Sequence, residues 1–166
     1  ITGLGLAFSS FVLSMSQGIL PLALFLTMIG SIILGMGVPT TAQYIITSTL
    51  AAPALAQMGV PMFSAHLFCL YFGVLADVTP PVALATYASA GIAKSEPLKT
   101  GFTALLVAAA GFIVPYMFIY NPGLLLQGSV FEIVFASVTA LIAVIGLSAA
   151  VQGYFADDIN IIERLL

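Results

Sequence analysis

The sequence GMGVPTT at residues 35–41 separates two apolar runs, residues 19–34 and 42–56. Each run is shorter than the roughly 20 residues that a helix needs to cross the apolar core of a membrane. Glycine and proline favour departure from helical geometry, and at membrane depth such backbone survives only inside protein or beside a wet cavity. We therefore predict a re-entrant helical hairpin with its tip near residues 36–41. The alternative is a short external loop between two tilted spans.

A second interruption, ADVTPP at residues 76–81, lies between apolar pieces at 62–75 and 82–93. Two consecutive prolines have no backbone N–H groups, so carbonyls one turn earlier lose their partners. Each flanking piece is well short of the roughly 20 residues of a full span. The pattern predicts one broken helix over residues 62–93, with the break near 77–81.

The composition places both interruptions in a membrane protein. Of 166 residues, 61% are hydrophobic and 5% are charged, whereas soluble domains carry about 25% charged residues. No charged residue occurs from Ile1 to Ala76, and this stretch is long enough to cross a bilayer several times as helix. We expect an all-α polytopic membrane protein. Because the chain opens on Ile within apolar sequence, we interpret it as a piece of a longer protein.

The rare reactive residues exclude several other classes of protein. The three basic residues, Lys94, Lys99 and Arg164, are too few to neutralise a nucleic-acid backbone. A single cysteine, Cys69, excludes an internal disulfide, and with the single histidine, His66, it leaves too few ligands for a structural zinc site.

The remaining sequence continues the membrane pattern. The charge cluster at residues 94–100 is predicted as an aqueous loop, and its two lysines slightly favour the cytoplasmic side. Residues 101–119 and 131–151 are predicted as further spans. The acidic tail from Asp157 onward is predicted as an amphipathic helix at the membrane interface.

These elements divide the chain into two regions. We expect residues 1–125 to form one region that holds the hairpin, the broken helix and the following span. Residues 126–166 add a C-terminal transmembrane helix and the interfacial tail.

The first break offers groups of both polarities. Gly37 permits backbone conformations closed to other residues, Pro39 cannot donate a backbone hydrogen bond, and Thr40 and Thr41 add hydroxyl oxygens. Carbonyls freed at the end of the first half-helix attract a cation, and the N–H groups that begin the second attract an anionic group. Many transporters hold coupling ions and substrate at discontinuous helices of this kind.

The second break adds a carboxylate, Asp77, and a further hydroxyl, Thr79. Thr79 is a hard oxygen ligand of the type that a small cation prefers. An ionisable group within a span is costly unless it faces a partner or water. Asp77 therefore either attracts a cation or carries a proton, or it caps N–H groups at a helix end near the interface. Pro39 and Pro80 accompany it as candidate contacts for substrate or ion.

Four motifs, in this order and spacing, resemble the large membrane subunit of tripartite ATP-independent periplasmic (TRAP) transporters. The similarity is greatest to the fused permeases that work with the TAXI class of substrate-binding proteins. The motifs are GMGVPTTA at 35–42, TPPV at 79–82, ASAGIA at 88–93 and FIVPYMF at 112–118. The resemblance covers residues 20–125 well and the remainder loosely.

The resemblance implies an elevator-type transporter built from two inverted repeats, of which this chain holds the second. Residues 30–56 would be its hairpin and residues 62–93 its broken helix. The implied coupling ion is sodium, with no other cofactor. The sodium ligands implied by the resemblance, several of them through backbone carbonyls, fall around Gly37, Thr40, Thr41, Val78 and Thr79.

The resemblance also implies partners and a location. A periplasmic substrate-binding protein would deliver an organic acid or a similar small solute, and a small membrane subunit or its fused equivalent would complete the permease. The implied location is the inner membrane of a bacterial or archaeal cell, crossed several times, with no nucleic-acid partner.

Two other functional classes compete with a carrier. Intramembrane aspartyl proteolysis needs two carboxylates that share a proton, and the apolar part of the chain offers Asp77 alone. Serine proteolysis would pair a serine with His66, but no Gly-x-Ser-x-Gly motif occurs. We therefore expect no enzyme, and a passive channel or an assembly subunit is the third reading.

Overall fold

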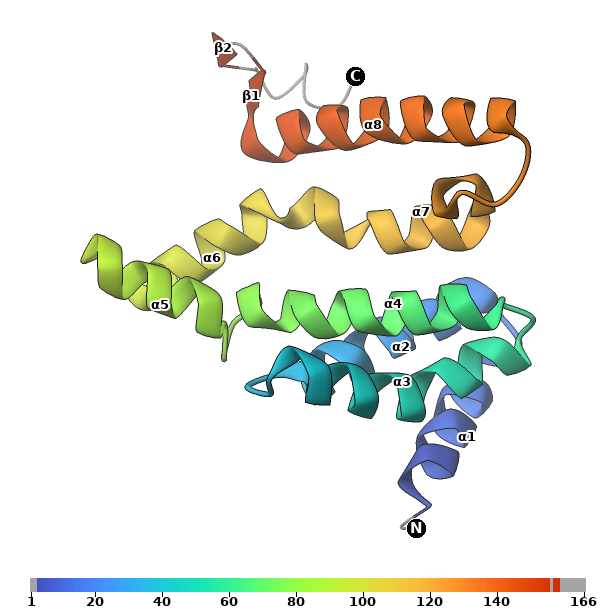
Figure 1. Ribbon diagram of the computed structural model, residues 1–166. Helices are drawn as coiled ribbons and strands as arrows, with labels where there is room; N and C mark the ends of the chain where they lie inside the picture. The colour runs from blue at the N-terminus through green and yellow to red at the C-terminus, as the bar shows by residue number, and fades with distance from the viewer. Residues whose placement is uncertain (1–2, 156, 159–166) are drawn as a thin grey trace. The chain divides into compact units, whose positions relative to one another are not determined.

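A computed structural model describes residues 3–155 and 157–158 of the chain. Their regular structure is helical apart from one pair of two-residue strands (Figure 1). The elements are α1 (Leu4–Ser16), α2 (Leu20–Gly35), α3 (Thr40–Gln57), α4 (Met62–Leu75), η1 (Ala76–Val78), α5 (Leu84–Ala93), α6 (Pro97–Val107), η2 (Ala109–Phe112), α7 (Val114–Tyr120), η3 (Pro122–Leu125), α8 (Val130–Gln152), β1 (Tyr154–Phe155) and β2 (Asp157–Asp158). The predicted all-α fold class is confirmed. The chain divides into two compact units, Ile1–Gly101 and Phe102–Leu166.

The first unit is built on the mutual packing of α1 to α4, and α2, α3 and α4 all contact one another. Phe68 and Phe72 of α4 are fully buried, and their rings meet edge to face with centroids 4.8 Å apart. The single cysteine, Cys69, is buried beside them with a free thiol next to the Ser31 hydroxyl of α2. Large apolar side chains such as Ile33 remain 61% exposed, which suits a surface in contact with lipid.

The hairpin of α2 and α3 has ends that the sequence explains. Pro21 occupies the first turn of α2, where its missing N–H costs no hydrogen bond. At the other end Gly37 has a φ of 75°, a left-handed conformation that glycine adopts without a steric penalty. Pro39 then precedes α3 as its N-terminal flanking residue. The turn at residues 36–39 lies within the predicted tip, whereas its depth in a membrane stays a prediction.

The broken helix also has the predicted form. Helix α4 tightens into the short helix η1, and regular helix resumes only at Leu84. Ala83 stands between them with a φ of 38°, and its N–H donates to the Thr79 carbonyl at 3.2 Å. The interruption thus covers residues 76–83, a little wider than the predicted 77–81.

Residues 101–119, expected as one span, do not form a continuous helix. Helix α6 ends at Val107, and the following segment Ala109–Tyr120, which holds η2 and α7, is bent from it by 58°. Pro115 lies in the first turn of α7, and its ring excludes a regular helical hydrogen bond to the carbonyl of Gly111. The apolar composition of this stretch concealed the bend because hydropathy does not report on backbone hydrogen bonds.

Helix α8 begins at a capping box, in which the side chains of Ser129 and Glu132 each accept a hydrogen bond from the backbone N–H of the other. Among the described residues it is the one continuous helix long and apolar enough to cross a membrane, and the bent pair of α6 and α7 would be a second crossing if it counts as one span. Most of α8 is exposed, since only 6% of its most apolar stretch is buried inside the protein.

The expected interfacial helix is not found where the tail is described. Tyr154 and Phe155 instead pair antiparallel with Asp158 and Asp157. Gly153 ends α8 with a φ of 70°, a left-handed conformation common at helix C-termini, and the chain turns back after it. Residues 159–166 lie outside the described part of the chain.

Candidate functional site

The two breaks lie side by side in the first unit. Figure 1 shows the turn between α2 and α3 next to the segment that leads from α4 to α5. A Cβ atom added to Gly37 would lie 3.7 Å from a methyl group of Val82. Segments about 40 residues apart in the sequence are therefore in van der Waals reach of each other.

A pocket of about 390 Å³ opens between the breaks. Residues 37–40 line it from the first break, Asp77 lines it from the second, and Leu84 and Ala85 line it from the start of α5. The structure thus brings four of the predicted site residues, Gly37, Pro39, Thr40 and Asp77, into one cavity. Thr41, Val78, Thr79 and Pro80 occupy the flanking backbone without lining this pocket.

The first break supplies polar backbone to this pocket. Within the described residues, the carbonyl oxygens of Gly37 and Val38 accept no hydrogen bond. Helix α2 ends at Gly35 and helix α3 begins at Thr40, so a negative helix end and a positive helix end face the same turn. Free carbonyls are ligands for a hard cation, and N–H groups at a helix start are donors to an anionic group.

Asp77 contributes a formal negative charge to the same cavity. The residue is half-buried, and its carboxylate accepts no hydrogen bond from the described residues. Helix α5 has no side-chain cap, so Asp77 does not cap that helix. A carboxylate that lines a pocket without a protein partner is suited to attract a cation.

Thr79 holds its hydroxyl against the helix that precedes it. The hydroxyl donates to the carbonyl of Leu75 at 2.7 Å, and this leaves the lone pairs of its oxygen available as acceptors. Oxygen donors from carbonyls, a carboxylate and hydroxyls make a set that fits a small hard cation.

Sequence reasoning missed Gln43, which is 1% exposed in the first turns of α3. Its side-chain amide donates to the carbonyl of Gly35 at 2.9 Å and also to the carbonyl of Gly73. The sequence feature that could have identified Gln43 is its amide, which stands among apolar or hydroxyl side chains shortly after the first break.

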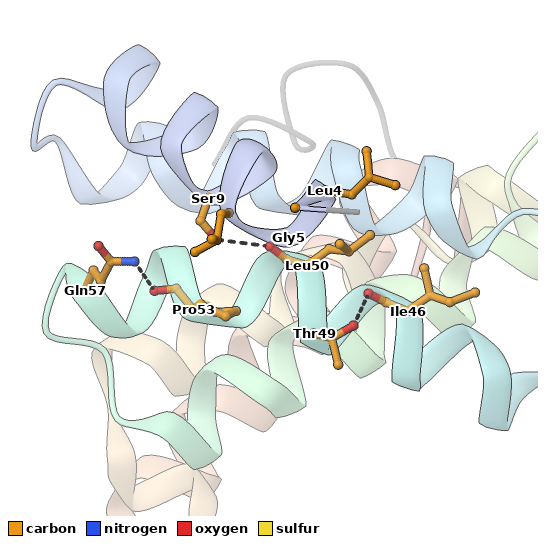
Figure 2. Close-up of a pocket in the computed structure, with 10 residues that line it drawn as sticks. Leu4, Gly5, Ser9, Ile46, Thr49, Leu50, Pro53 and Gln57 are labelled. Carbon is orange, nitrogen blue, oxygen red and sulfur yellow. Dashed lines mark hydrogen bonds between the residues drawn. The ribbon is translucent and has the colours of Figure 1, made fainter. Parts of the chain in front are cut away.

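A larger cavity, about 780 Å³, lies elsewhere, between α1 and α3. Figure 2 shows Ser9 of α1 donating to the carbonyl of Leu50, at 3.2 Å, beside Pro53 of α3. Pro53 cannot donate to the carbonyl of Thr49, and Gly5 leaves room for that carbonyl. The cavity has no charged lining residue and contains none of the predicted site residues.

The single histidine has a partner that argues against proteolysis. The Tyr44 hydroxyl and His66 Nδ1 lie 3.1 Å apart, in hydrogen-bonding contact. His66 therefore contacts a phenol rather than a serine nucleophile.

Comparison with known proteins finds a family model that matches most of the chain. The family model described as "Tripartite ATP-independent periplasmic transporter, DctM component" matches residues 1–133. No curated protein and no solved structure matches the chain.

Proposed function

Because this chain belongs to the DctM component family of tripartite ATP-independent periplasmic transporters, we propose that it is the C-terminal part of a sodium-coupled permease. Membership of this family makes the chain a membrane transport component and not an enzyme. It also implies a periplasmic binding protein and a small membrane subunit as partners.

We infer further that the pocket between the two breaks binds sodium. The observation that carries this proposal is the meeting of Gly37, Pro39, Thr40 and Asp77 in one cavity. Sodium in this pocket would be attracted by Asp77 and bound by oxygen atoms of the breaks, with Thr41, Val78 and Thr79 adding ligands from the adjoining backbone and side chains.

Ion binding at this place would couple to transport through the position of the hairpin tip. Sodium bound between the breaks favours the arrangement in which the tip contacts the second break. If that arrangement also completes the substrate site, substrate and sodium each bind better when the other is present. The imported solute is an organic acid or a similar small molecule, with Pro39 and Pro80 as candidate contacts, and the location is the inner membrane.

Sodium titration of the full-length permease tests the proposal. Thermal unfolding is measured in sodium chloride and in choline chloride at equal ionic strength. We expect sodium to raise the midpoint temperature with saturation, because a ligand that binds the folded state stabilises it. A midpoint that does not distinguish sodium from choline would contradict sodium binding.

The Thr79→Ala variant tests the ligands. Loss of one oxygen ligand is expected to raise the half-saturating sodium concentration about tenfold, which corresponds to about 1.4 kcal/mol. The matched control is Thr139→Ala in α8, because the Thr139 hydroxyl donates to the Phe135 carbonyl at 2.8 Å in the same way. Wild-type sodium dependence in Thr79→Ala would remove this residue from the site.

Uptake by the reconstituted transporter separates a carrier from a channel. Proteoliposomes that hold the full complex are supplied with radiolabelled carboxylic acids, with and without an inward sodium gradient. A carrier accumulates one of these acids above the outside concentration only with the gradient. A passive channel brings the two concentrations to equality and no further.

A further inference from the structure

The side chain of Gln43 joins three helices at the point where the two breaks approach each other. Gln43 belongs to α3, and its two recorded acceptors are Gly35 of α2 and Gly73 of α4. Gly35 is the last residue of α2, directly before the tip. Gly73 precedes Asp77 by about one helical turn. One amide therefore holds the end of α2, the start of α3 and the end of α4.

The two glycines make this contact sterically possible. A Cβ atom on Gly35 would lie 2.7 Å from the Gly73 carbonyl oxygen, and a Cβ atom on Gly73 would lie 3.3 Å from Gln43 Cγ. Real Cβ atoms essentially never approach a heavy atom as closely as the first distance. Side chains at these two positions would push α2 and α4 apart and displace the amide.

Simple packing does not explain an amide at this position. Burial of a polar group costs free energy unless its hydrogen bonds are made, and Gln43 Oε1 has no partner among the described residues. The hydroxyl of Thr27, eight residues before Gly35 on α2, is also buried without a hydrogen-bond partner among the described residues. An apolar side chain of similar size, such as methionine, would fill the volume without leaving an unpaired oxygen.

We propose that Gln43 is a positioning residue that sets the separation of the two breaks and thereby the sodium affinity of the pocket between them. This inference rests on the proposed sodium site. Gln43 does not line the pocket, so it acts through the backbone that it holds: the Gly35 carbonyl next to the tip and the Gly73 carbonyl next to Asp77. Loss of the Gln43 amide would leave the sodium ligands in place but would allow the distance between the two breaks to vary.

The test compares Gln43→Met with wild type in the full-length permease. Methionine keeps the approximate volume and removes both donors. The measured quantity is the sodium chloride concentration that gives half of the maximal thermal stabilisation, with choline chloride as the reference salt. We expect this half-saturating concentration to rise about tenfold, the same change that we expect for the loss of one oxygen ligand. The matched control is Gln57→Met, because the exposed Gln57 amide donates only to the Pro53 carbonyl, at 3.3 Å.

The outcomes distinguish this inference from the proposed function. If wild type shows no sodium response, the sodium site itself is wrong. If wild type responds and Gln43→Met has a lower midpoint in choline but the same half-saturating concentration, Gln43 is purely structural and the inference is overturned.

A second variant keeps the test decisive if Gln43→Met does not fold. Gly73→Ala retains the amide and crowds Gln43 Cγ, whereas Gly91→Ala adds a methyl group where no atom lies within 4 Å. We expect Gly73→Ala to raise the half-saturating sodium concentration several-fold and Gly91→Ala to leave it unchanged. If Gly73→Ala has the same half-saturating sodium concentration as wild type, the inference is overturned.

Discussion

At the scale of single residues, the site depends on one carboxylate in otherwise uncharged surroundings. Asp77 lines the pocket between the breaks, and the chain has no charged residue before it. Attraction between a carboxylate and a cation is strong where little water screens it. Asp77 is therefore the residue whose charge matters most for ion binding.

We expect Asp77→Asn to raise the half-saturating sodium concentration of the full-length permease about tenfold, since a change of about 1.4 kcal/mol is of the order expected for a partly screened charge. Thermal stabilisation by sodium chloride against choline chloride measures it. Glu96→Gln is the control, because it removes an exposed carboxylate in the loop before α6. Equal sodium dependence in both variants would assign Asp77 a role other than cation attraction.

At the scale of elements, the hairpin and the broken helix are held together by the close approach of α2 and α4. This approach needs a glycine at position 35, because the Cβ atom of any other residue there would clash with the Gly73 carbonyl oxygen. The packing of these helices can therefore be tested apart from ion binding.

Gly35→Ala is expected to lower the free energy of unfolding by about 1–3 kcal/mol, the usual cost of overpacking, in a sodium-free denaturant titration. Gly146→Ala in α8 is the matched control, since the added methyl group meets no atom within 4 Å. We expect that control to be neutral or stabilising by up to about 1 kcal/mol, because alanine favours helix over glycine. An unchanged Gly35→Ala variant would mean that α2 and α4 separate easily.

The elements differ in how far the sequence predicted them. Both breaks follow from local causes, glycine and proline within apolar runs, and the structure has helix ends at these places. Pro115 similarly separates η2 from α7, but no proline marks Ala108, where the chain bends. The role of Gln43 was not predictable, because it depends on Gly73, thirty residues further along the chain. Local sequence indicates where a helix ends, but it does not indicate which distant carbonyl accepts a hydrogen bond from a side chain there.

At the scale of the whole molecule, the exposed apolar surface requires lipid. Side chains in the middle of α8, such as Leu141 at 61% exposure, face away from the protein. Water would make this arrangement unfavourable. Family membership and helix composition agree that the chain belongs in a membrane.

Leu141→Lys is expected to make membrane insertion of α8 less favourable by about 2.5–3.5 kcal/mol, the cost of a lysine at the centre of a spanning helix. A translocon insertion assay on the full-length permease measures this apparent free energy. Gln127→Lys, an exposed position before the helix, is expected to change it little. Normal insertion of the Leu141→Lys variant would argue that α8 does not cross the hydrocarbon.

The buried thiol of Cys69 makes internal motion of this fold accessible to chemistry. Since the side chain has no exposed surface, a maleimide can alkylate it only during moments when α4 parts from its neighbours. The labelling rate would thus measure how often α4 transiently separates from its neighbours. Slower alkylation in sodium chloride than in choline chloride would show that the ion restrains this breathing motion.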